Sequence, residues 1–488
     1  MFETARRRSR GAAVLLLAAW VSSCAIGPDY LRPAVEVPSA YKEDGHWKPA
    51  APGSVDSREP WWTGYGDATL DQLVVAANAA NQSVRQAEAQ YRQALAAIDA
   101  ARAAGLPQVG VDASGARGVS ATTAPGNANT LSVGVTASWE PDLFGGVRRA
   151  VEASRASAEA SGDDLAAARL AIQSALAQTY FQLRYLDVQR ELFAATNAAF
   201  AKSLALTRAQ YGQGVAMRSD LAFAEAQLES TQATAVDLDA QRAALEHAIA
   251  VLVGRPPAAF SLAELTPAKA YAARLPDIPR ALPSELLERR PDIAAAERLA
   301  AAANAQIGVA RAAYFPTLSL SASGALAASS LSTLISAPTR VWSLGAALAQ
   351  TLFDGGLRRA RSAEAVAAYD ATVASYRQTV LTGFQQVEDD LATLGVLDQE
   401  IAHQDAAVRA AQLAERLALA QYRGGTVTYL TVITAQTLSL SNERTAVQLR
   451  SRQLSTSVAL VAALGGGWRA GVAESASAAP LPASSSAR

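Results

Sequence analysis

The sequence contains few of the residues that carry out chemistry in enzymes. In 488 residues, cysteine occurs once, methionine twice and histidine three times. The single cysteine, Cys24, excludes an internal disulfide. His46, His247 and His403 are too far apart in sequence to match a metal-ligand motif, and no Walker or G-x-S-x-G motif occurs. We therefore expect a protein that is not an enzyme and that binds no metal or nucleotide.

Net charge and long apolar runs are also lacking. The 43 basic side chains nearly balance the 44 acidic ones and the isoelectric point is near 6.4, so nothing favours binding to nucleic acid. After residue 24, no run of 18 or more apolar residues occurs, so we expect no membrane-spanning helix in the mature chain. Any crossing of a membrane must then be made by strands.

Proline is absent from two long stretches, residues 145–214 and 356–424. Each stretch predicts one helix of about 68 residues, which is roughly 100 Å long. Within both stretches, apolar residues recur every seven positions, a period typical of coiled coils. These rows are Leu165, Ile172, Leu186, Phe193 and Phe200 in the first stretch and Val366, Val373, Val380, Val387, Leu394, Ile401 and Val408 in the second.

The two stretches belong to a tandem duplication. Residues 142–150 recur, with substitutions, as residues 352–360. Each long stretch ends at a glycine-bearing turn, and a helical pattern about half as long follows it, at 217–253 and at 428–464. We expect each long helix to pack antiparallel to the shorter helix that follows it.

Upstream of each long stretch the apolar period changes from seven to two. The alternation predicts strands at about 107–118 and 130–141 in the first repeat and at about 316–328 and 340–352 in the second. Such strands suit a tilted bilayer crossing. Four strands cannot close a barrel, and unpaired edges cannot face lipid. We therefore expect three chains to share about twelve strands, while alternation alone leaves a soluble two-sheet domain as the alternative.

The same alternation assigns two faces to these strands. Val133 and Leu320 belong to the apolar set, which we expect to face lipid. Ser132 and Ser319 belong to the set of small polar residues, which we expect to line a wet lumen.

The N-terminus has the features of a lipoprotein signal. Residues 1–23 combine a basic region with an apolar core, and Val21-Ser-Ser-Cys24 resembles a lipobox, in which the cysteine carries a covalent lipid. The alternative is an ordinary signal peptide with an incidental cysteine. The remaining divisions are an extended linker at 24–66, the first repeat at 67–255, a proline-rich connection at 256–283, the second repeat at 284–467 and a disordered tail at 468–488.

Several motifs share the order found in one known family. They are Cys24-Ala-Ile-Gly-Pro-Asp-Tyr30, Trp61-Trp62, Asp142-Leu-Phe-Gly145, Leu252-Val-Gly-Arg-Pro-Pro257, Leu287-Glu-Arg-Arg-Pro-Asp-Ile293 and Phe353-Asp-Gly-Gly356. In these motifs the chain resembles the outer-membrane efflux factor family of TolC-like channels, in particular its NodT or OprM type of lipoprotein. The resemblance implies a mainly α fold with a membrane β-barrel, built as a homotrimer with four strands per chain.

The resemblance also implies a function and partners. The expected function is the outer-membrane exit duct of a tripartite efflux pump, working with a periplasmic adaptor and an inner-membrane pump of the resistance-nodulation-division type. One alternative is the outer-membrane duct of a type I protein secretion system. Another is a lipid-anchored periplasmic coiled-coil scaffold without a pore.

A periplasmic gate is the remaining implication of the resemblance. The family's mouth is often ringed by aspartates, but the matching positions here are Thr431 and Thr434. The family pairs an aspartate matching Asp220 with a tyrosine matching Tyr422, so we expect a hydrogen bond between these two side chains to help close the mouth. The alternative is that Asp220 is a solvated carboxylate in a first helical turn.

The turns that end the long stretches complete the candidate site. Glycine permits the left-handed backbone that a tight reversal at a helix end needs. We expect the turns, with Gly212 and Gly214 in one and Gly424 and Gly425 in the other, to form a periplasmic tip where an adaptor docks.

Overall fold

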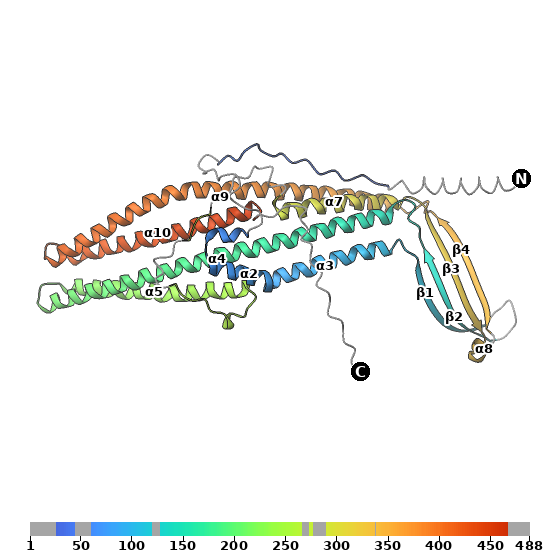
Figure 1. Ribbon diagram of the computed structural model, residues 1–488, viewed down its shortest axis with the longest axis horizontal. Helices are drawn as coiled ribbons and strands as arrows, with labels where there is room; N and C mark the ends of the chain where they lie inside the picture. The colour runs from blue at the N-terminus through green and yellow to red at the C-terminus, as the bar shows by residue number, and fades with distance from the viewer. Residues whose placement is uncertain are drawn as a thin grey trace. The chain divides into compact units, whose positions relative to one another are not determined.

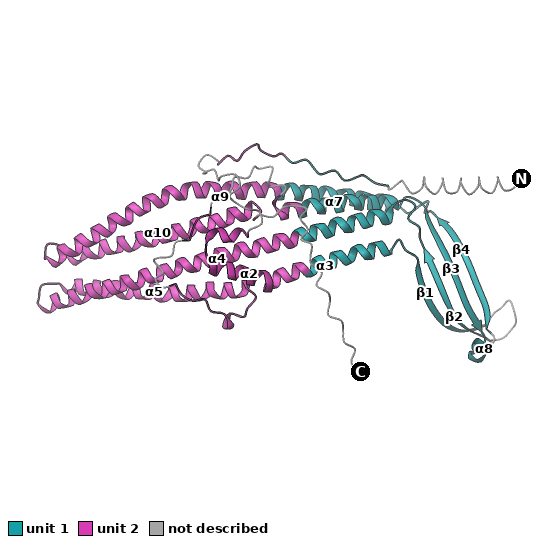
Figure 2. Cartoon of the chain, viewed as in Figure 1, with its two compact units in different colours: residues 1–35, 89–163, 295–379 teal, residues 36–88, 164–294, 380–488 magenta. Residues whose placement is uncertain are grey.

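The computed structural model describes residues 26–43, 60–119, 127–265, 273–276, 289–336 and 338–466. The expected signal peptide, Cys24, the disordered tail and parts of the two connecting segments lie outside these residues. The chain divides into two compact units (Figure 2). Unit 1 consists of residues 1–35, 89–163 and 295–379, and unit 2 consists of residues 36–88, 164–294 and 380–488.

Both repeats contain a helix, two strands, a long helix and a shorter helix in this order (Figure 1). In the first repeat the described elements are η2 Trp61–Tyr65, α2 Ala68–Ala80, α3 Gln82–Ala103, β1 Gln108–Val119, β2 Asn127–Trp139, α4 Gly146–Gly212 and α5 Arg218–Leu252, with η3 Pro257–Ala259 after it. In the second they are α7 Pro291–Ala312, β3 Thr317–Ala328, α8 Leu331–Ser336, β4 Thr339–Ala349, α9 Leu357–Arg423 and α10 Tyr429–Ala463.

The two long helices are confirmed. α4 and α9 each contain 67 residues, and α5 and α10 each contain 35. In unit 2, the seven-residue row of α4 is buried against α5. Leu186 and Phe193 pack on Leu238, while Phe200 packs near Leu228, closer to the start of α5. Since positions rise along α4 as they fall along α5, the two helices are antiparallel, as expected.

The aromatic core of unit 2 gathers where α2 packs against α4, α5 and α10. Asp67 begins α2 by accepting hydrogen bonds from the backbone N–H groups of Thr69 and Leu70, and its carboxylate also accepts one from the Tyr180 hydroxyl at 2.7 Å. Asn81 separates α2 from α3, at the break that the sequence indicates. Tyr65, Tyr180 and their neighbours are almost fully buried. This core therefore holds η2 and α2, at the start of the first repeat, against the other helices of unit 2.

One expectation for the linker was wrong. Residues 24–66 were expected to be extended, but Trp61–Tyr65 forms the 3-10 helix η2. Its Trp62 and Tyr65 side chains are buried, and the Tyr65 hydroxyl lies 3.0 Å from the Ser457 hydroxyl of α10. Burial of these two large rings stabilises the 3-10 helix. The local sequence does not indicate this burial.

Unit 1 contains a single four-stranded antiparallel sheet in the order β1-β2-β3-β4. The strands lie where the alternation predicted them, although β2 begins at Asn127, before its expected start. The short helix α8, between β3 and β4, was not foreseen. Figure 1 shows α8 at one end of the sheet, whereas the other end leads into the helices of the same unit. Among the described residues, no helix is both long and apolar enough to cross a bilayer.

Candidate functional site

The strand register places the apolar side chains of all four strands on one face. Val111 of β1 pairs with Val135 of β2, which pairs with Gly324 of β3, which pairs with Trp342 of β4. Val133 and Leu320 lie on this same face, since Leu320 pairs with Trp139, which is six residues from Val133. The expected grouping of these residues is confirmed, and a face built this way suits lipid.

The opposite face carries small hydroxyl side chains. The Ser114 and Ser132 hydroxyls are 2.8 Å apart across β1 and β2, and the Ser323 and Ser343 hydroxyls are 2.9 Å apart across β3 and β4. Ser319 donates a hydrogen bond to Glu140 at 3.2 Å. In the single chain these polar groups are exposed or half-buried, so this face suits water.

The two outer strands of the sheet have no second strand partner within the described chain. β1 pairs only with β2, and β4 pairs only with β3. Each outer strand therefore leaves a row of backbone N–H and C=O groups unpaired, which cannot remain so in lipid.

The N-terminal segment is fixed to unit 1 close to the sheet. The backbone N–H of Ile26 donates to the Phe144 carbonyl, and Arg149 donates to Asp29 at 3.0 Å. At Gly27, φ is +120° and a Cβ would lie 2.6 Å from the Cα of Gly308, so only glycine fits. Phe144 lies between β2 and α4, so the segment after Cys24 begins where the strands meet the helices.

The turns after α4 and α9 lie at one end of unit 2. Gly214 has φ +74° and Gly425 has φ +71°, and a Cβ at either would meet nothing within 4 Å. Both turns therefore need a left-handed residue and are open to solvent, as the sequence indicates. Gly212 ends α4 and Gly424 follows α9, but neither has a positive φ. Their role in adaptor docking stays a prediction.

Tyr422 lies near the end of α9, next to these turns, and contacts Tyr429 and Thr207. Its ring is 6% exposed and lies 5.2 Å from the ring of Tyr429. Its hydroxyl lies 3.2 Å from that of Thr207 on α4. The Thr207 hydroxyl also donates to the Ser203 carbonyl, so it accepts the hydrogen bond from Tyr422. Burial, with a smaller contribution from the adjacent Tyr422, raises the pKa of Tyr429 to about 12, so the Tyr429 hydroxyl stays protonated at physiological pH.

The other candidate gate residues lie nearer the surface. Asp220 is in the first turn of α5, where its carboxylate accepts a hydrogen bond from the Met217 backbone N–H at 3.4 Å. Among the described residues of the single chain, no hydrogen bond joins Asp220 to Tyr422. Thr431 and Thr434 are exposed on α10, and Thr434 donates to the Leu430 carbonyl. Whether these three residues act in a gate stays a prediction.

A family model described as "Outer membrane efflux protein" matches residues 73–255 and 282–466. The chain belongs to this outer membrane efflux protein family. It is 32% identical to the pyoverdine export outer membrane protein OpmQ of Pseudomonas aeruginosa, over 92% of this chain and 95% of that protein. It is also 32% identical to the outer membrane protein OprJ of the same species, over 96% of this chain and 98% of that protein.

Solved structures agree with this assignment. The outer-membrane channel OprN is similar with a TM-score of 0.81 and 32% identity, covering 91% of this chain and all of that one. The efflux protein described here is therefore an outer-membrane channel with a TolC-like fold. This confirms the main functional expectation over the secretion duct and the scaffold.

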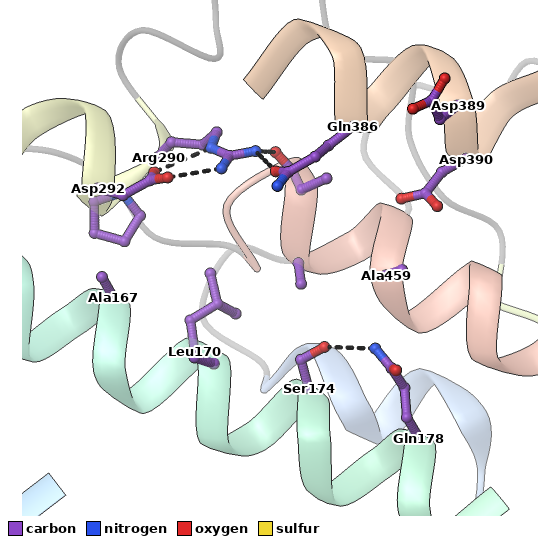
Figure 3. A pocket seen from close by; sticks show the side chains of 14 residues that line it. Ala167, Leu170, Ser174, Gln178, Arg290, Asp292, Gln386, Asp389, Asp390 and Ala459 are labelled. Carbon is purple, nitrogen blue, oxygen red and sulfur yellow. Dashed lines mark hydrogen bonds and ion pairs between the residues drawn. The ribbon is translucent and has the colours of Figure 1, made fainter. Parts of the chain in front are cut away.

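The efflux protein also has a cavity that sequence reasoning missed (Figure 3). Its volume is about 570 Å³, and residues of α4, α9, α10 and the start of α7 line it within unit 2. Buried Arg290 donates to the Asp292 carboxylate at 2.7 Å, to the Gln386 amide oxygen at 2.9 Å and to the Ala463 carbonyl at 3.1 Å. The motif around Arg290 signalled family membership, but its spacing did not indicate which helices the guanidinium joins.

Asp390 is the one lining residue with a strongly altered acidity. Its carboxyl is half-buried at the cavity, and burial raises its pKa to about 7, with a smaller contribution from the neighbouring charge of Asp389. Among the described residues, no group of three His, Cys, Asp or Glu side chains could hold a metal ion. Asp390 gives the cavity a carboxyl group whose charge changes near neutral pH.

Proposed function

We propose that three copies of this chain form one exit duct, with a twelve-stranded barrel in the outer membrane and a helical tunnel in the periplasm. The observation that carries the proposal is the sheet of unit 1, which has one apolar face, one hydroxyl-rich face and two unpaired edges. Pairing β4 of one copy with β1 of the next continues the antiparallel order and leaves no edge in lipid.

The duct conducts its cargo passively. No nucleotide-binding motif occurs in the chain, so the energy for transport comes from partners. These are an inner-membrane pump and a periplasmic adaptor, and the adaptor docks at the open turns around Gly214 and Gly425. The chain performs no catalysis and carries no cofactor other than its lipid. Pyoverdine export by the relative OpmQ makes a small secreted metabolite one class of cargo to test.

Cys24 carries the lipid anchor in this proposal. The hydrogen bond from Ile26 to Phe144 supports it, because Ile26 lies only two residues after Cys24. Two extended residues span at most about 7 Å. A lipid on Cys24 would then enter the membrane beside the barrel. Mass spectrometry of the mature N-terminus tests this: an acylated Cys24 is expected, whereas a free Cys24 or cleavage at another residue contradicts it.

Transport is tested in the source bacterium, with the pump and adaptor genes left intact. Deleting the gene for this chain should raise the accumulation of efflux dyes or drugs, and the wild-type gene should restore efflux. The purified protein should also give discrete conductance steps in planar bilayers. Loss of a secreted protein without a change in efflux would favour a type I secretion duct, and absence of conductance would favour a pore-less scaffold.

A further inference from the structure

The four strands carry only three charged side chains, and these are distributed unevenly. Asp112 and Arg117 lie on β1 and Arg340 lies on β4, whereas β2 and β3 have none. The segments that join the strands, 120–126 and 329–338, contain no charged residue at all. The strands therefore carry two positive charges and one negative charge, and the segments that join them add none.

Both arginines lie on the apolar face. Arg340 pairs with Leu326, which pairs with Val133 on that face. Arg117 is six residues beyond Val111 on the same strand, and successive side chains on a strand alternate between faces. Asp112, one residue from Val111, lies on the opposite face and does not pair with them.

Both arginines also lie at the end of the sheet that carries α8. Arg117 is two residues from the end of β1, and Arg340 is the second residue of β4. The Arg117 and Arg340 side chains are exposed, and neither forms an ion pair within the described residues. Trp342, two residues from Arg340 on the same face, is 74% exposed. Tryptophan beside a basic residue is typical of the level where lipid headgroups begin.

A charge on the lipid face is tolerated at this level but not in the middle of the bilayer. The cost of an arginine is largest at the midplane and becomes small near the interface. A long side chain reaches the headgroups from there. The planar guanidinium binds phosphate through two parallel hydrogen bonds, which makes a phosphorylated headgroup its natural partner.

The unpaired edges bring the two arginines together. β1 and β4 are the outer strands, so closing a barrel places β4 of one copy beside β1 of the next. Since Arg117 and Arg340 lie at the same end of these strands, each seam would hold one of each. Within one sheet, the row of Arg340 meets β1 at Ala113, four residues before Arg117. We propose that Arg117 and Arg340 form, at each of three seams, a binding site for the phosphorylated headgroup of an outer-leaflet glycolipid of the lipopolysaccharide type. The proposal rests on the trimeric barrel proposed above.

The test uses the purified full-length protein with its lipid-free and lipid-loaded states compared by native mass spectrometry. Rough lipopolysaccharide is the probe, and the same lipopolysaccharide after enzymatic dephosphorylation is the ligand control. The Arg117→Gln/Arg340→Gln variant should bind the phosphorylated form roughly 30-fold more weakly, since each basic residue near a charged membrane surface contributes about 1 kcal/mol. Wild-type protein should bind the dephosphorylated form about as weakly as this variant binds the phosphorylated one.

Two further variants serve as controls for folding and for the loss of positive charge elsewhere. Arg311→Gln/Arg359→Gln removes two exposed arginines from α7 and α9 and should leave binding unchanged. Arg117→Lys/Arg340→Lys keeps both charges, so it should fold and retain an intermediate affinity. Equal binding by wild type and the Gln variant overturns the proposal, as does an equal loss of phosphatidylglycerol binding. A wild-type protein that forms no trimer in the same spectra refutes the proposed function instead.

Discussion

At the scale of single residues, the contact between Tyr422 and Thr207 is the clearest candidate for a latch. It joins the end of α9 to the end of α4 through a buried hydrogen bond between residues 215 positions apart. A buried hydrogen bond of this kind contributes about 0.5–1.5 kcal/mol. Its loss can therefore shift an equilibrium between closed and open mouths by roughly 2–10-fold.

Replacing Tyr422 by phenylalanine should accordingly raise the open probability or conductance of single channels in planar bilayers. The matched control is Tyr211→Phe, which changes the equivalent tyrosine of the first repeat, where the ring is 40% exposed. Thr207→Val should have the same effect as Tyr422→Phe, and the double variant should gain little more. If Asp220→Ala opens the channel while Tyr422→Phe does not, the latch assigned to Thr207 is wrong.

Asp390 gives a second prediction at this scale. Because its pKa in the folded chain is about 7, above the ordinary value of 3.8, the folded state binds its proton more tightly than the unfolded state does. Its contribution to stability is thus fully present below pH 4 and is lost as the pH rises through about 7. Asp390→Asn should stabilise the protein at pH 8 by about 1–2 kcal/mol, a range that allows for solvent screening at this half-buried site.

The measurement is the thermal unfolding midpoint across the pH range. The gain from Asp390→Asn should shrink towards zero as the pH falls to 4. Asp389→Asn removes only the neighbouring exposed charge and should give a smaller gain at pH 8. A gain that is the same at pH 4 and pH 8 would mean that the titration of Asp390 does not contribute.

At the scale of elements, the two faces of the strands make opposite predictions for adjacent positions. Val133→Arg places a charge among apolar side chains and should cost roughly 2–4 kcal/mol if the position lies near mid-membrane. Ser132→Arg places the same charge on the hydroxyl-rich face and should be tolerated. Heat-resistant trimers recovered from outer-membrane fractions report the difference. Comparable yields from the two variants would show that the faces are assigned wrongly.

The elements also show which features the sequence predicts. The long helices follow from local properties, namely the absence of proline and a seven-residue apolar period, and both were predicted to within a few residues. The same holds for the turns at Gly214 and Gly425, where a positive φ requires glycine. The 3-10 helix at Trp61–Tyr65 could not be predicted this way, because contacts with residues such as Ser457, far along the chain, stabilise it.

The candidate site was harder to predict than the fold for the same reason. Tyr422 was singled out through its place in a family motif, and its role in a gate stays a prediction. The contact of its hydroxyl with Thr207 was not foreseen, because several polar side chains near the helix ends could accept its hydrogen bond. Thr207 lies on α4, whereas Asp220 lies in the first turn of α5. The register of two packed helices decides that choice, and no local pattern reveals it.

At the scale of the whole molecule, the central claim is that one chain supplies a third of a channel. The sheet of unit 1 has an apolar face, which suits lipid, and two unpaired edges, which are not stable in a membrane. A family match over both repeats shows that the chain is an outer-membrane efflux channel. Three copies of its four strands would give the proposed twelve-stranded barrel.

Native mass spectrometry of the protein extracted from outer membranes tests this claim most directly. The account predicts one dominant species with the mass of three mature chains, and this species should also conduct in planar bilayers. A dominant species of one or two chains that still conducts would contradict it.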